Sequence, residues 1–80
     1  MMELIKIMDR DILGYYYIPE NSGQVGIIEI HEDTKEVSIY SLSKYEKKLA
    51  YPNYAYKAKG VVKRMFDNGE LLERKFLVWG

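Results

Sequence analysis

The chain of 80 residues contains no cysteine, only two prolines and a single histidine. The absence of cysteine excludes disulfide bonds, thiolate zinc sites, thiol nucleophiles and thiol redox switches. A chain of this length buries only about 60 to 65% of its unfolded surface, so its stability rests on a small apolar core or on a partner chain. Because 48% of the residues are hydrophobic, we expect a folded unit rather than a disordered tail.

Long uncharged runs are also absent. No apolar run approaches the roughly 20 residues of a membrane span. The initial stretch "MMELIKIM" is interrupted by Glu3 and Lys6, unlike the apolar core of a secretory signal. We therefore expect a cytoplasmic protein without membrane contact. The sequence has no internal repeat, linker or low-complexity tract, and we expect one domain over residues 1–80.

An excess of charge of one sign is lacking, since 12 basic residues balance 12 acidic ones. This balance argues against a surface devoted to polyanions. The distribution is uneven, because acidic side chains concentrate in residues 20–36 and basic side chains in residues 44–64. We expect an acidic end and a basic end on the folded molecule.

Tyrosine, isoleucine and valine occur in short runs that are typical of strands. The runs predict strands over residues 4–8, 12–18 and 76–79. The clearest element is a hairpin with strands over 25–31 and 37–41, joined by the polar segment 32–36. Apolar and polar side chains alternate in both strands of this hairpin, as expected for a sheet that is covered on one face.

The stretch "YAYKAKGVVKRMF" at residues 54–66 decides the fold class. Placed at about 100° per residue, its apolar side chains fall on one side of a helix and its lysines on the other. We predict a helix over about 53–68, with Asn53 as its N-cap and the "NG" pair at 68–69 as its stop. Gly60 opposes this helix, since glycine in a helix interior costs about 1 kcal/mol relative to alanine. The alternative is a hairpin that turns at the same "NG" pair.

The predicted fold is α+β in two layers, an antiparallel sheet of three to four strands packed by one amphipathic helix. An all-β meander or small barrel is the alternative. The segment "SKYE" at 43–46 has the form of a capping box and predicts a further short helical turn. The expected core joins two sets of apolar side chains, one from the hairpin and one from the helix: Ile28, Ile30, Val37 and Ile39, and Ala58, Val62, Met65 and Phe66.

Catalytic chemistry has little support in this sequence. His31 follows a predicted strand beside Glu32 and Asp33, and we interpret it as a surface imidazole near a turn. No nucleophile elbow, zinc spacing, calcium loop or phosphate loop is present. A metal would have to use Asp9 and Asp11 with the His31 cluster, without a recognised spacing. We expect no enzyme activity, no cofactor, no metal and no small-molecule substrate.

Two kinds of partner remain. The first is another protein or a second copy of this chain, because tyrosine and tryptophan anchor interfaces, and neighbouring tyrosines on a strand point to opposite faces. The candidate interface residues are Tyr15, Tyr17, Tyr40 and Trp79. We favour this reading, with a homodimer or a docked partner as the functional form.

The second kind of partner is a nucleic acid, which lysines and aromatic rings can bind together through phosphate contacts and base stacking. The candidate contacts are Tyr56, Lys57, Lys59, Lys63 and Arg64 on the basic face of the predicted helix. This small regulator is the alternative function. In size, tyrosine and lysine usage and lack of cysteine, the chain resembles small bacterial or phage-borne proteins, without a motif that identifies a family.

Overall fold

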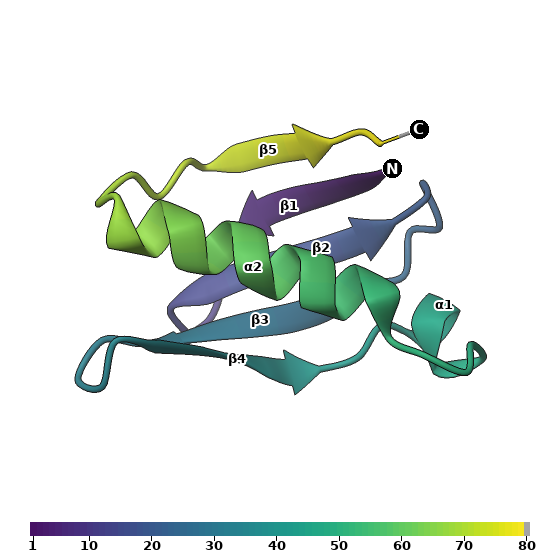
Figure 1. The fold of residues 1–80 in the computed structure, drawn as a ribbon, viewed down its shortest axis with the longest axis horizontal. Helices are drawn as coiled ribbons and strands as arrows, with labels where there is room; N and C mark the ends of the chain where they lie inside the picture. Colours follow the sequence, from purple (N-terminus) through teal and green to yellow (C-terminus); the bar gives the residue numbers. More distant parts are fainter. Residues whose placement is uncertain (80) are drawn as a thin grey trace.

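A computed structural model describes residues 1–79 of the chain. The elements follow in the order β1 (Met2–Lys6), β2 (Gly14–Pro19), β3 (Gly26–His31), β4 (Glu36–Ser41), α1 (Lys44–Lys47), α2 (Asn53–Asp67) and β5 (Arg74–Leu77). The strands form one antiparallel sheet in the order β4-β3-β2-β1-β5 (Figure 1). The predicted α+β class is confirmed, but the sheet has five strands rather than three to four.

The five strands correspond to the five segments that the sequence predicted, and the sheet is larger than expected because the first and last of them pair with each other. Strands β1 to β4 form a meander, and β5 then returns to the free side of β1 (Figure 1). The register places Leu4 opposite Lys75, and the Lys6 amide donates to the Glu73 carbonyl at 2.8 Å. Consequently β4 and β5 are the two edge strands of the sheet.

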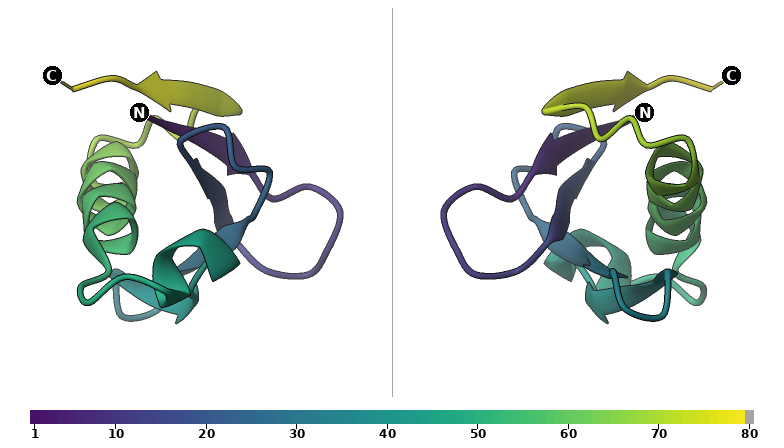
Figure 2. Two further views of the ribbon diagram at one scale, coloured as in Figure 1. Left: turned by 90° about the vertical axis from the view of Figure 1, so that its right-hand side faces the viewer. Right: turned by 90° about the vertical axis from the view of Figure 1, so that its left-hand side faces the viewer.

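Helix α2 covers one face of the sheet, and the loop between β1 and β2 projects from the other face (Figure 2). The buried side of the helix consists of Ala55, Ala58, Val62 and Met65. They pack with Ile28, Ile30 and Val37 from the hairpin, and Ile39 and Phe66 lie partly buried beside them. The predicted helix, hairpin and core are therefore confirmed.

Two residues that we placed on an exposed interface belong to the core. Tyr15 and Tyr17 are both 0% exposed and lie under α2. The predicted alternation of side chains along β2 was correct, but the face assigned to Tyr15 and Tyr17 was wrong. Tyr17 is paired with Leu4 and Tyr15 with Ile28, and all four side chains lie on the face of the sheet that α2 covers. The Tyr17 ring also fills the space left by Gly26, where a Cβ atom would lie 2.1 Å from the ring.

The two ends of α2 are satisfied in different ways. The predicted stop is confirmed: Gly69 adopts φ 67°, the Gly69 amide donates to the Phe66 carbonyl, and the Glu70 amide donates to the Met65 carbonyl. The predicted N-cap is wrong, because Asn53 is already helical and Pro52 precedes it without a side-chain cap.

The cap of α2 comes instead from Glu46 in α1. The buried Glu46 carboxylate accepts a hydrogen bond from the Ala55 amide at 2.9 Å. Ser43 caps α1 by accepting from the Glu46 amide at 3.3 Å, as the "SKYE" pattern predicted. The short helix α1 therefore positions a carboxylate that satisfies a free amide at the start of α2.

Candidate binding groove between α2 and β5

A groove of about 410 Å³ runs between helix α2 and the edge strand β5. We call it the α2–β5 groove. It is lined from the helix by Tyr56, Lys57, Gly60, Val61 and Arg64, and from the β5 segment by Lys75, Phe76, Leu77, Val78 and Trp79. Past Arg64 and Lys75 it adjoins a smaller hollow of about 180 Å³ that includes Glu70.

The groove exists because the helix lies off the centre of the sheet. Its packing contacts are mainly with β2, β3 and β4, so the helix side of β1 and β5 is less covered (Figure 1). The gap is open at Gly60, where a Cβ would meet no atom within 4 Å. The glycine that weakened the helix prediction therefore faces open space at the groove.

Within residues 1–79, the charged side chains that line the groove are all basic. Lys57, Arg64 and Lys75 are its charged residues, and none of them forms an ion pair within residues 1–79. The uncharged lining between them includes Gly60, Val61 and Leu77. Such a surface suits a ligand with negative charge and some apolar length.

The outer edge of β5 presents free backbone groups beside the groove. Lys6 and Glu73 form a hydrogen-bonded pair, and such pairs alternate along an antiparallel ladder. By this alternation, Lys75 and Leu77 bond to β1, whereas the amides and carbonyls of Arg74 and Phe76 point away from the sheet. No strand of the described chain pairs with this side of β5.

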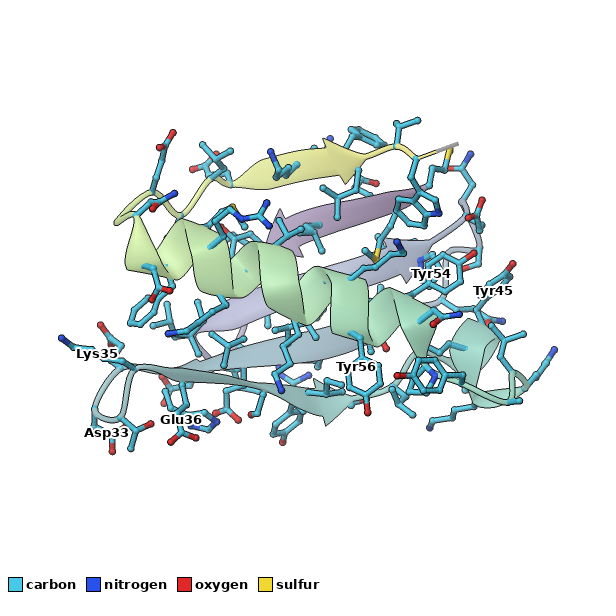
Figure 3. All side chains as sticks on the ribbon, viewed as in Figure 1. Asp33, Lys35, Glu36, Tyr45, Tyr54 and Tyr56 are labelled. Carbon is cyan, nitrogen blue, oxygen red and sulfur yellow. The ribbon has the colours of Figure 1, made fainter. Side chains whose placement is uncertain are left out.

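A cluster of three aromatic rings, from Tyr45, Tyr54 and Trp79, packs at one end of the groove. The Trp79 ring lies 5.9 Å from the Tyr54 ring, and Tyr54 meets Tyr45 edge to face at 5.7 Å (Figure 3). The Tyr54 hydroxyl donates to Glu20 at 2.8 Å, and this bond raises the pKa of Tyr54. The Lys57 ammonium lies 4.7 Å from the centre of the Trp79 ring.

The predicted nucleic-acid residues do not form one surface. Lys57 and Arg64 line the α2–β5 groove, whereas Lys59 and Lys63 line a hollow on the β4 side. The Lys63 ammonium is already engaged, since it lies 2.9 Å from both the Lys35 carbonyl and the Asp67 carboxylate. Helical rotation of about 100° per residue places Lys57 and Arg64 on one side of the outer surface of the helix and Lys59 and Lys63 on the other.

Tyr56 lies between these two groups of cations. It contributes to the rim of the groove, but its ring packs against Tyr51 at 5.4 Å. Figure 3 shows the ring on the β4 side of the helix. Tyr56 is therefore poorly placed to stack a ligand over β5.

The predicted protein-interface residues are likewise dispersed. Trp79 is 38% exposed and lies in the groove, whereas Tyr40 is 53% exposed on the other edge strand. Tyr15 and Tyr17 are in the core, as described above. The sequence pattern did not indicate four other residues of the groove, Gly60, Val61, Lys75 and Leu77. The signal that it offered was a glycine within an otherwise well-formed helix.

The side chain of His31 lies beside residues of β3 and β4. Its Nε2 atom lies 2.8 Å from the Ser38 hydroxyl and 3.8 Å from the Glu29 carboxylate. Asp9 accepts a hydrogen bond from the Tyr16 hydroxyl at 2.6 Å. Within residues 1–79 no group of three or more histidines and carboxylates is arranged to hold a metal ion.

Comparisons with known proteins identify no relative. Neither a protein family, nor a curated protein, nor a solved structure matches this chain. In the part of the chain that the structure describes, no helix has the length and apolar character needed to cross a bilayer.

Proposed function

We propose that this protein is a protein-interaction module that binds an extended segment of a partner protein by strand addition to the outer edge of β5. The observation that carries the proposal is the free edge of β5 alongside the α2–β5 groove. An added strand would gain affinity from backbone hydrogen bonds and selectivity from every second side chain. The proposed role is binding rather than catalysis.

The geometry of such a complex follows from the register of β5. Glu3 is opposite Phe76 and Leu4 is opposite Lys75, so Lys75 and Leu77 project to the helix side of the sheet. A strand added beside β5 would lie about 4.8 Å away and place alternate side chains over the groove. Its other side chains would lie on the far face of the sheet, near Phe76, which is 58% exposed.

Binding of a nucleic acid through the same groove has weaker support. The β5 edge offers amide donors and carbonyl acceptors in alternation, and a peptide backbone matches both. A phosphate backbone only accepts hydrogen bonds, so the outward carbonyls of Arg74 and Phe76 would gain nothing from it. In addition, Lys59 and Lys63 lie on the other side of α2.

The substitution Phe76→Pro tests strand addition. It removes an outward amide and leaves the hydrogen bonds from β5 to β1 intact, because proline is tolerated on an edge strand when its nitrogen faces solvent. Phe76→Ala is the matched control, since it removes the same ring but keeps the amide. Circular dichroism and thermal melting would verify that both variants fold.

The binding assay begins with selection of short random peptides displayed on phage against the unaltered protein. We expect selected peptides to lose affinity by at least about tenfold on Phe76→Pro, comparable to one lost backbone hydrogen bond with its strand contacts. The loss on Phe76→Ala should be clearly smaller. Failure to select any peptide, or equal affinity for the two variants and the unaltered protein, would contradict strand addition.

A further inference from the structure

We infer that the segment bound at β5 is acidic, with carboxylates at alternate positions that meet Lys57, Arg64 and Lys75. This inference rests on the proposed strand addition and specifies the partner. The three cations line one groove, they have no carboxylate partner within residues 1–79, and the ten residues of the lining include no Asp or Glu.

The arrangement of the cations fits the repeat of a strand. Lys57 and Arg64 are seven positions apart in α2, which corresponds to about 10.5 Å along the helix axis. Side chains on one face of a strand recur every 6.8 Å or so, and three successive ones span about 13.6 Å. Three alternate carboxylates therefore extend over the whole distance from Lys57 to Arg64.

The apolar lining favours glutamate over the shorter aspartate in the bound segment. Gly60, Val61 and Leu77 contribute to the groove between the charged groups. The methylenes of a glutamate can pack on this lining while its carboxylate reaches the ammonium and guanidinium groups above it. Gly60 contributes directly, because any larger side chain would occupy the space that the incoming side chain needs.

A second copy of this chain is a poorer occupant of the same edge. The β5 strand carries Arg74 and Lys75 in sequence, so two β5 edges paired together would bring like charges close to one another. An acidic segment meets the opposite charge at the same positions. Charge complementarity therefore favours a glutamate-rich extended segment over self-pairing at β5.

Three synthetic peptides of one length test the inference, with glutamate, glutamine or lysine at three alternate positions separated by valine. Fluorescence anisotropy would give their affinities at low and moderate salt. The glutamate peptide should bind at least about tenfold tighter than the glutamine peptide at low salt, with a difference that shrinks as salt rises. The lysine peptide should bind the weakest.

Two lysines on the same helix provide a matched pair of variants. Lys57→Glu reverses a charge in the groove, and Lys59→Glu makes the same reversal on the β4 side of the helix. We expect Lys57→Glu to weaken the glutamate peptide by at least about tenfold and Lys59→Glu to weaken it by less than about threefold. An equal loss of peptide affinity in both variants would show that affinity depends only on the net charge of the protein and would overturn the inference.

The outcomes separate this inference from the proposed function. If the glutamine peptide binds as tightly as the glutamate peptide and both are lost on Phe76→Pro, strand addition stands and the acidic preference is refuted. If the glutamate peptide binds Phe76→Pro and the unaltered protein equally, strand addition itself is refuted. Displacement of the glutamate peptide by single-stranded oligothymidylate, with unchanged oligonucleotide binding to Phe76→Pro, would favour a nucleic-acid partner and overturn both.

Discussion

The buried carboxylate of Glu46 supports a prediction about stability that depends on one hydrogen bond. Its Oε1 atom accepts from the Ala55 amide at 2.9 Å, and both residues are almost completely buried. Glu46→Ala leaves that amide without a partner, at a cost of about 1 to 3 kcal/mol, and removes a capping interaction of the kind worth about 0.5 to 2 kcal/mol. These two estimates describe the same contact and are not additive.

A compensating gain keeps the expected loss below the upper end of this range. The Oε2 atom of Glu46 is buried and has no hydrogen-bond partner among residues 1–79, so its removal relieves a desolvation penalty. We therefore expect Glu46→Ala to lower the free energy of unfolding by about 2 kcal/mol, which corresponds to a fall of roughly 8 to 16 °C in Tm for a domain of this size. Urea denaturation followed by far-UV circular dichroism measures the change.

Glu46→Gln is the control, because its amide oxygen keeps an acceptor near the Ala55 amide. We expect Gln to cost clearly less than Ala, by about 1 kcal/mol or more. Hydrogen exchange at the Ala55 amide should accelerate in the alanine variant and change little in the glutamine variant. A loss below about 0.5 kcal/mol for Glu46→Ala, with unchanged exchange at Ala55, would refute capping by Glu46.

Three further substitutions test other contacts. Gly60→Ala should raise the free energy of unfolding by about 0.5 to 1 kcal/mol in urea denaturation, because it improves a helix position that has open space around it, and a clear loss would contradict the helical geometry. Gly26→Ala should lower it by about 1 to 3 kcal/mol, since the added Cβ would lie 2.1 Å from the Tyr17 ring, and a neutral result would contradict this packing. Burial raises the pKa of Tyr17 from 10.0 to about 12, which favours its neutral form in the folded state. The stability that comes from burying the neutral Tyr17 hydroxyl is therefore complete below pH 10 and is lost as the pH rises towards 12. The urea concentration at the denaturation midpoint should therefore fall less steeply between pH 10 and 12 in Tyr17→Phe than in the unaltered protein. An identical fall of the midpoint in Tyr17→Phe and in the unaltered protein would contradict the raised pKa of Tyr17.

The features that the sequence predicted are those whose causes are local. The hairpin from Gly26 to Ser41 follows from two alternating runs around a polar turn. The end of α2 follows from Gly69, which adopts the left-handed conformation that stops a helix. The sidedness of α2 follows from the spacing of its own apolar residues, and Gly60 did not outweigh that pattern.

The features that the sequence did not predict depend on contacts between distant residues. Alternation along β2 separates Tyr15 and Tyr17 from Tyr16, but only the neighbouring strands decide which side α2 covers. The cap of α2 comes from Glu46, nine residues before Ala55. Residues near Lys75 pair with β1 at the opposite end of the sequence, and this pairing, which the sequence did not indicate, places β5 at the edge of the sheet beside the groove.

Amide hydrogen exchange of β5 with and without the glutamate peptide tests whether the peptide binds to the outer edge of this strand. In the free protein the Arg74 and Phe76 amides should exchange quickly, whereas the Lys75 and Leu77 amides should be protected by β1. We expect the peptide to slow exchange at the Arg74 and Phe76 amides and to leave exchange at the Lys75 and Leu77 amides nearly unchanged. Saturating peptide that leaves the Arg74 and Phe76 amides as exposed as before would contradict binding at this edge.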